Sequence, residues 1–228
     1  MAFSLLLNGM GQAQPGQNPA KNGSFEEIRN ELPANWMAPG YGREKANIKI
    51  YVEKNGAFAG DHFVTIECVR PFTGRLIQFV TVQPDRMYRF SCRIKAAGEQ
   101  TGKGAFISVM NTPAASTDIK ETGGEWQYVE FFGRTGPEQT QVAAALQFGI
   151  PASLNTGKAS FDDFRVEEVT GIPQGSKAVN LYRDIPDKPA RKVIFTKNPR
   201  PVISVSFLLV CLMLLFPGVY YLLLRQKN

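Results

Sequence analysis

The sequence has little of the chemistry that most enzymes and metalloproteins require. It contains one histidine and three cysteines in 228 residues. No C-x-x-C pair and no cysteine–histidine cluster occurs, which excludes the common zinc and dithiol motifs. A G-x-S-x-G turn, a phosphate-binding glycine loop and an H-E-x-x-H helix are also absent. We therefore predict a protein that is not an enzyme, and we interpret the lone His62 as a surface or capping residue.

Helical periodicity is also missing over most of the chain. Before residue 202, short runs alternate apolar and polar residues, and Gly, Pro, Asn or Asp bound them, which is typical of half-buried strands. The runs recur about every ten residues, a spacing that favours a sandwich over a parallel α/β sheet. They cover residues 48–53, 62–68, 76–82, 87–96, 105–110, 126–132, 141–150 and 159–169. The sequence predicts an all-β sandwich domain over residues 22–170.

The C-terminal part departs from this pattern. Residues 203–224 contain no charged side chain, and about 20 apolar residues in a helix span a hydrocarbon core of about 30 Å. We predict a single transmembrane helix over residues 202–224, with the lipid bilayer as partner and a short basic tail over 225–228. Residues 171–201 are basic and rich in proline, which predicts an extended stalk.

The first residues bear on which side of the membrane the domain lies. Residues 1–21 begin with MAFSLLLNGMGQAQ, an apolar run followed by small residues, which is typical of a secretory signal. The basic residues before the transmembrane helix favour a cytoplasmic domain by the positive-inside rule, but long domains behind a signal cross regardless of charge. We predict a single-pass protein of a bacterial membrane with its domain outside the cytoplasm, periplasmic or extracellular.

The basic charge of the chain is unevenly distributed. The chain has a formal net charge of +6, and its basic excess lies in residues 171–228, whereas the predicted sandwich has more acidic than basic residues. A basic segment beside a membrane suits anionic lipid headgroups. Because aromatic and basic residues do not interleave as in nucleic-acid modules, nucleic acid is excluded as a partner.

The order of the motifs resembles the jelly-roll carbohydrate-binding modules attached to cellulases and xylanases, of the CenC-like type. An N-G-x-F-E opening, a following Trp, a glycine-containing turn, a strand that starts at Tyr and a closing F-D-D strand occur in that order. These are NGSFEE (22–27), LPANW (32–36), GAFAGDHFVTIE (56–67), MYRFSCRIKA (87–96), EWQYVEFFGRT (125–135) and KASFDDFRVEEV (158–169). The resemblance implies a jelly-roll sandwich and glycan binding without catalysis.

The resemblance also implies a structural calcium ion (Ca2+). In such modules, the Glu of the opening motif and an Asp of the closing motif share the ion, and the matching residues here are Glu26 and Asp162 or Asp163. Calcium takes 6–8 oxygen ligands, so Asp61 is a further candidate. Asp163 has the parity of Phe161, so we expect it to turn inward. The alternative is that the two aspartates are solvated carboxylates at a strand end.

Aromatic rings are the usual platforms for sugars, because a ring face stacks on the C–H face of a pyranose. Trp36 and Trp126 match family positions that pack in the core, and Tyr88 has the parity of its strand's apolar face. The candidate ligand-binding residues are therefore Tyr41 and Tyr51.

Two further questions stay open at the level of the sequence. Cys68 and Cys92 lie on successive strands and form either a disulfide or two buried thiols. The function is either that of a membrane-anchored, non-catalytic domain that holds or recognises glycan at the cell envelope, or that of an accessory subunit. In the second case the sandwich docks on other subunits of a membrane complex.

Overall fold

The computed structural model describes residues 18–43, 46–98 and 102–183. These residues form strands, turns and loops, and none of them belongs to a helix that is long and apolar enough to span a bilayer. The predicted transmembrane helix and basic tail, most of the stalk and residues 1–17 of the signal-like segment lie outside the described residues. Their assignments stay predictions.

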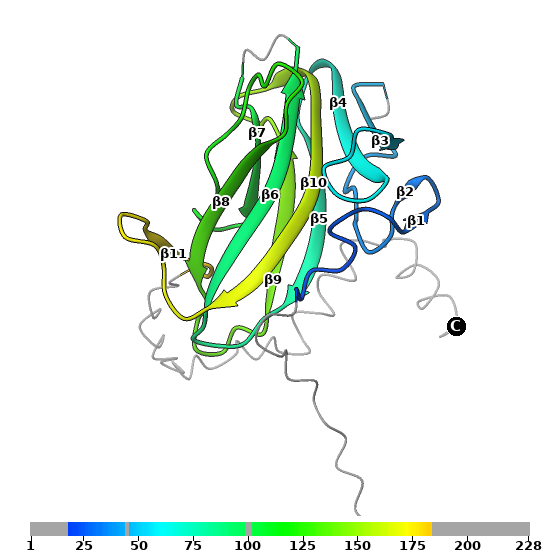
Figure 1. The fold of residues 1–228 in the computed structure, drawn as a ribbon. Coiled ribbons are helices and arrows are strands. Elements are labelled where there is room, and N and C mark those ends of the chain that lie inside the picture. Colours follow the sequence, from blue (N-terminus) through cyan, green and yellow to red (C-terminus); the bar gives the residue numbers. More distant parts are fainter. Residues whose placement is uncertain (1–17, 44–45, 99–101, 184–228) are drawn as a thin grey trace, which may run out of the picture. The chain divides into compact units, whose positions relative to one another are not determined.

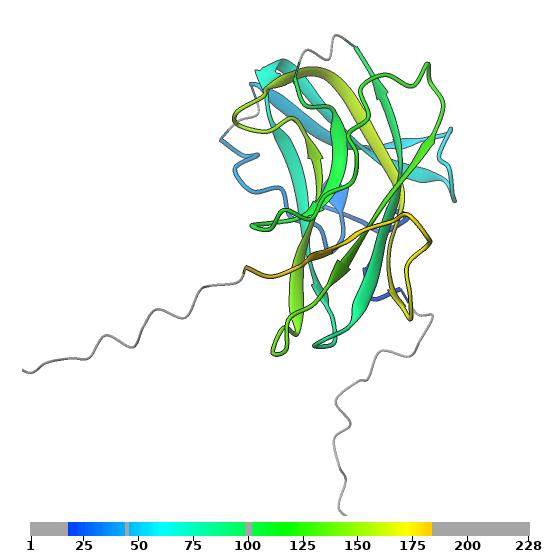
Figure 2. The same cartoon turned by 90° about the vertical axis from the view of Figure 1, so that its left-hand side faces the viewer.

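The described residues form a two-layered β-sandwich (Figures 1 and 2). One layer is a sheet of six strands in the order β11 (Ala178–Asn180), β8 (Gln127–Arg134), β6 (Met87–Ala97), β10 (Asn155–Val169), β4 (His62–Phe72) and β3 (Ile48–Lys54). The other layer is a sheet of three strands in the order β5 (Gly74–Thr81), β9 (Gln141–Phe148) and β7 (Ala105–Val109). Strands β1 (Ile28–Arg29) and β2 (Leu32–Pro33) form a small hairpin. The predicted β-sandwich is confirmed.

The period-2 alternation of the strands places apolar side chains between the sheets. In β6, Tyr88, Phe90, Cys92 and Ile94 are buried in the core, whereas the residues between them lie on the outer face. The Phe90 ring stacks on Phe131 of β8, with ring centroids 4.8 Å apart. Alternation therefore gives the six-stranded sheet one face buried against its partner sheet and one outer face.

The N-G-x-F-E opening ties the start of the domain to the closing strand. The Asn22 amide donates to the carbonyl oxygens of Glu27 and Ala34. A Cβ on Gly23 would lie 2.0 Å from the carbonyl oxygen of Phe164, so only glycine fits this approach. Phe25 and Trp36 are buried, and the Trp36 indole packs edge-on against the Phe164 ring at 5.3 Å. The residues of the opening motif therefore fasten the start of the domain to the core and to β10.

The folded part extends beyond residues 22–170 at both ends. The Asn18 side chain bonds to the backbone of Phe164 and Val166 in β10, and the Lys21 N–H donates to Gln78. At the other end, β11 adds to β8 in parallel, and Leu181 is buried in the core. Residues 18–21 and 171–181 are therefore part of the sandwich.

The two cysteines of the sandwich are both free and buried. Burial raises the pKa of the Cys68 thiol to about 12 and raises that of Cys92 well above its ordinary value. Of the two alternatives left open by the sequence, the structure has the pair of buried thiols.

Candidate functional site

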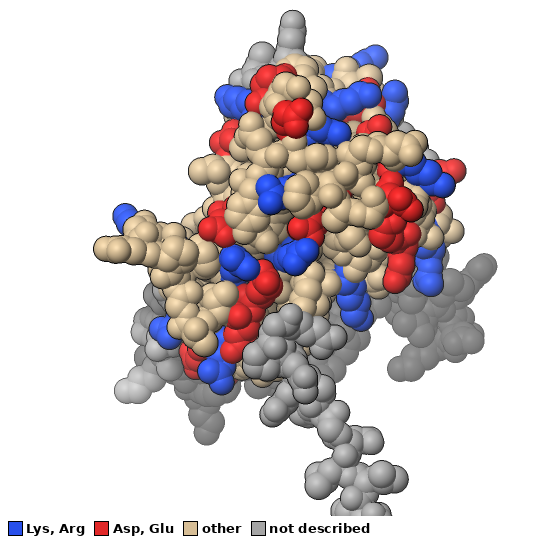
Figure 3. Space-filling view, viewed as in Figure 1, with Lys and Arg blue, Asp and Glu red and all other residues tan. Residues whose placement is uncertain are grey.

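The outer face of the six-stranded sheet combines aromatic, cationic and hydroxyl-bearing side chains. Its residues come from β3, β4, β6, β8 and β10, and from the turns that precede β4 and β8. Basic and acidic groups are interspersed on this side of the molecule (Figure 3). Five adjacent strands span about 19 Å at the usual spacing between strands, which is enough for several sugar rings. This face is the candidate functional site.

The first feature of this face is an arginine that lies against two exposed rings. The Arg93 guanidinium carbon lies 4.2 Å from the centroid of the Phe58 ring and 4.9 Å from that of Tyr128. Phe58 is 44% exposed and Tyr128 is 45% exposed. The Tyr128 hydroxyl donates to Glu130 Oε2 at 2.8 Å. Two partly exposed aromatic rings therefore lie against one cation.

A lysine on the same face lies over two more rings that pack against each other. Lys95 Nζ lies 4.7 Å from the centroid of Phe63 and 4.6 Å from that of Trp126. The Trp126 indole packs edge-on against the Phe63 ring and donates its N–H to the Gly56 carbonyl at 3.0 Å. A cavity of about 280 Å³ adjoins this group, and Phe63, Lys95, Lys158 and Glu53 are among the residues that line it.

The far side of the face carries a hydrogen-bonded polar network. Thr65 Oγ1 bonds to Glu53 Oε1 at 2.7 Å and to Ser160 Oγ at 2.8 Å. The Tyr51 hydroxyl donates to Glu67 Oε2 at 3.1 Å. Cross-strand register aligns Lys95, Ser160, Thr65 and Tyr51 in one row across the sheet. In this row, the buried hydroxyls of Thr65 and Ser160 lie between the cation of Lys95 and the aromatic ring of Tyr51.

The two tyrosines predicted as ligand-binding residues lie on different surfaces. Tyr51 is on the candidate face, and its ring centroid lies 6.0 Å from Lys158 Nζ. Tyr41 packs against the hydrophobic core and donates to the Ile50 carbonyl at 3.4 Å. It lines a separate cavity of about 190 Å³, together with Phe72 and other residues. The structure therefore does not bring the pair together.

The expectation for Trp126 was wrong, whereas Trp36 lies in the core as expected. Trp126 precedes β8, and its indole lies on the outer face instead of between the sheets. Reading the sequence also missed Phe58, Arg93 and Lys95. The alternation of β6 was enough to place Arg93 and Lys95 on the face opposite the apolar residues. Phe58 lies in a turn, where side chains follow no such alternation.

Glu26, which the resemblance implies as a calcium ligand, bonds to the turn that leads into β4. Its Oε1 accepts from the N–H groups of Asp61 and His62, and its Oε2 lies 2.7 Å from His62 Nδ1. The bond from the His62 side chain is the main cause that lowers the Glu26 pKa below its ordinary value. His62 is thus a capping partner of Glu26.

Asp162 holds the same turn from the other side. Its Oδ2 accepts from the N–H groups of Phe58 at 2.7 Å and Ala59 at 3.0 Å, and its Oδ1 accepts from Asp163 N at 2.6 Å. Burial raises the pKa of the Asp162 carboxyl group, although these N–H donors oppose the shift. The carboxylate is completely buried.

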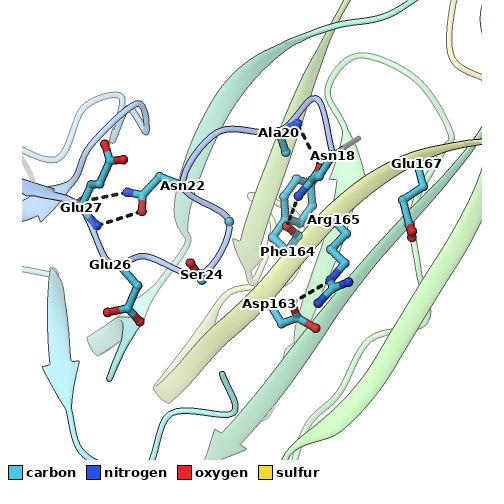
Figure 4. Close-up of a pocket in the computed structure, with 11 residues that line it drawn as sticks. Asn18, Ala20, Asn22, Ser24, Glu26, Glu27, Asp163, Phe164, Arg165 and Glu167 are labelled. Atoms are coloured by element: carbon cyan, nitrogen blue, oxygen red, sulfur yellow. Dashed lines mark hydrogen bonds and ion pairs between the residues drawn. The ribbon is translucent and has the colours of Figure 1, made fainter. Parts of the chain in front are cut away.

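Asp163 does not turn inward as its parity suggested. The register of β10 shifts between Asp162 and Arg165, and Asp163 takes a positive φ of 48° in this bulge. Its Oδ1 accepts from Arg165 Nε at 2.8 Å (Figure 4). The bulge breaks the alternation on which the expectation rested.

The three carboxylates do not fit a calcium ion as they are arranged. Glu26 and Asp162 face N–H donors, and Asp163 faces a guanidinium, whereas Ca2+ needs oxygen ligands. Glu26 and Asp163 line a cavity of about 450 Å³ near Asn18 (Figure 4). Within the described ranges, no three His, Cys, Asp or Glu residues form a group that could hold a metal ion. No contact of the described residues therefore supports the calcium ion that the resemblance implies.

Comparisons with known proteins identify the fold. The sequence matches no family model and no curated protein. Its structure is similar to that of TmCBM61, solved in complex with β-1,4-galactotriose, with a TM-score of 0.50, 19% identity and coverage of 67% of this chain and 99% of that chain. The xylan-binding domain CBM22-1 of Paenibacillus barcinonensis Xyn10C has a TM-score of 0.49 and 17% identity, with coverage of 71% and 100%. The chain therefore has the jelly-roll fold of carbohydrate-binding modules.

Proposed function

We propose that this protein binds a polysaccharide on the outer face of its six-stranded sheet and does not alter it chemically. The observation that carries the proposal is the pair of exposed rings, Phe58 and Tyr128, on an open sheet face. Such rings offer flat apolar surface for the C–H face of a pyranose. Elsewhere on the same face, Tyr51 and Glu53, which are half-buried, and Lys158, which is exposed, supply groups that can bond to sugar hydroxyls.

The positions of the acidic residues on this face favour binding over hydrolysis. The sequence offers Glu67 and Glu130 as a pair of carboxylates, on β4 and β8. Two strands separate β4 from β8 in the sheet, so their backbones are at least about 14 Å apart at the usual spacing. Paired carboxylates of glycosidases lie about 5–10 Å apart. Glu67 and Glu130 also each accept a tyrosine hydroxyl.

We further propose that residues 202–224 anchor the domain in a bacterial membrane, with the sandwich outside the cytoplasm. This part of the proposal rests on the uncharged apolar run alone. Confinement of many copies to one membrane would let weak contacts with a repetitive polymer act together. The accessory-subunit alternative stays a prediction.

A glycan array probed with the purified full-length chain tests the proposed function. We expect binding to at least one polysaccharide, and we expect Tyr128→Ala to abolish it. Phe79→Ala is the matched control, because Phe79 is 56% exposed on β5 of the other sheet. Binding to no glycan, equal binding by the two variants, or release of reducing sugar would each contradict the proposal.

A further inference from the structure

The candidate face carries two cations that have no carboxylate partner. Arg93 and Lys95 are two residues apart on β6, so both side chains project from the outer face. No carboxylate oxygen of the described residues lies within 4.0 Å of either cation. Three other cations of this sheet do have carboxylate partners. These are Arg89 with Glu167, Arg165 with Asp163, and Lys158 with Glu67.

Aromatic rings hold Arg93 in place without neutralising it. Asp162 lies opposite Arg93 in the cross-strand register, but its carboxylate accepts three backbone N–H groups. The Arg93 Nε–H is buried and has no acceptor in the described part of the chain. A ligand cannot reach this buried atom, but none of the described residues accepts a hydrogen bond from the rest of the Arg93 guanidinium either, so its terminal nitrogens keep donor capacity that the protein does not use.

Lys95 is in a similar situation at the edge of the 280 Å³ cavity. Lys158 lines the same cavity, and the two ammonium groups come from adjacent strands, β6 and β10. Glu53 lines it too, but its Oε1 accepts from the Thr65 hydroxyl. An anionic group of a ligand in this cavity would meet two lysines and one carboxylate that is already hydrogen-bonded.

From this charge pattern we propose that the polysaccharide is acidic, with sugar carboxylates that bind Lys95 and Arg93. The inference deepens the proposed function and rests on it. Hydrogen bonds between cations and carboxylates are stronger than those between neutral groups. The rings that hold both cations also fix their positions, which lowers the conformational entropy lost on binding. A neutral glycan would leave both charges without a partner.

The experiment compares ligands that differ only in charge. The full-length chain is titrated with polygalacturonate, alginate and hyaluronan, each beside its carboxyl-reduced counterpart. We expect at least one acidic polymer to bind about tenfold or more tightly than its reduced form, as charge-assisted hydrogen bonds predict. We also expect the preference to decrease as salt is added, because salt screens exposed charges.

Variants locate the effect on the two cations. Lys95→Gln and Arg93→Gln should each remove most of the preference for the acidic form, and Lys95→Arg should retain it. Arg75→Gln, an exposed cation of β5 on the other sheet, should leave the preference unchanged. Thermal melting of each variant shows that the fold persists.

The two proposals fail in different ways. Equal affinity for acidic and reduced polymers, or binding of neutral glycans alone, would overturn this inference and leave the proposed function standing. A preference that Lys95→Gln and Arg93→Gln both retain would also overturn it. Absence of binding to every polymer, neutral or acidic, would overturn both.

Discussion

The Asp162 carboxylate ties together three backbone N–H groups from two separate parts of the chain. Two of them belong to the turn before β4, and the third belongs to the bulge of β10. Phe58, one of the two exposed rings, is in that turn. The position of an aromatic surface on the candidate face therefore depends on a side chain that is itself completely buried.

Asp162→Asn should lower the free energy of unfolding by about 1–3 kcal/mol, because an amide N–H would face a backbone N–H that has lost its acceptor. The gain from removing a buried charge offsets part of this loss, but an amide has one oxygen instead of two, so in either orientation its NH2 group faces at least one of the three N–H groups. Urea denaturation measures the difference. Asp85→Asn is the control, because Asp85 is exposed and its positive φ suits asparagine equally. If both variants unfold like the wild type, Asp162 does not hold the turn.

The Glu26 carboxylate makes a pH-dependent contribution to stability. Its pKa is lowered in the folded state, chiefly by the bond from His62. A lowered pKa stabilises the fold above the ordinary value of 4.5, and this stabilisation is lost as the pH falls through the folded-state pKa. The stability difference between the wild type and Glu26→Gln should therefore shrink on acidification. A difference that stays constant or grows on acidification would contradict the assignment.

At the scale of elements, the parallel strand β11 closes one edge of the six-stranded sheet. Leu181 follows this strand, and its side chain lies over Gly133 of β8, where any Cβ would contact it at 2.2 Å. The Leu181 N–H donates to the Arg134 carbonyl at 2.8 Å. The segment after residue 170 is therefore an integral part of the core.

Leu181→Ala should destabilise the domain by about 2–5 kcal/mol, the usual cost of a cavity at a fully buried leucine. Chemical denaturation checks this value. Leu154→Ala is the matched control, because Leu154 is 39% exposed and should cost much less. Equal effects of the two substitutions would mean that the fold ends before Leu181.

The junction between the opening motif and β10 is the place where the sequence implied calcium. Because the carboxylates there already accept N–H and guanidinium groups, we expect the melting temperature to be the same in calcium and in excess chelator. A ligand that binds only the folded state at a hundredfold excess over its Kd would add about 2.7 kcal/mol. An increase in melting temperature with calcium, absent in Glu26→Gln, would instead show that the ion binds and displaces these donors.

The sequence predicted elements better than it predicted the site. Alternation in β6 correctly placed Tyr88 and Phe90 inward, because a regular strand repeats every two residues. The same rule failed at Asp163, where a bulge that no sequence period announces resets the register. It gave nothing for Phe58, which a turn positions through hydrogen bonds to a residue 104 positions later.

At the scale of the whole molecule, the buried and outer faces of the sandwich have different roles. The buried faces stabilise the sandwich, while the outer face of the larger sheet carries rings and cations that are not part of the hydrophobic core. Residues 58, 93 and 128 are far apart in sequence, and only the strand order β8–β6–β10–β4 brings them together. For this reason the sequence could suggest a class of function but could not assemble its site.

The most direct test of the central claim is isothermal titration of the full-length chain with the polysaccharide that it binds best on the array. We expect the double variant Phe58→Ala, Tyr128→Ala to lose binding below detection, while Phe79→Ala binds within about twofold of the wild type, since only the first removes aromatic surface from the candidate face. Melting curves confirm that both variants are folded. Retained binding by the folded double variant would contradict the assignment of glycan binding to the outer face of the six-stranded sheet.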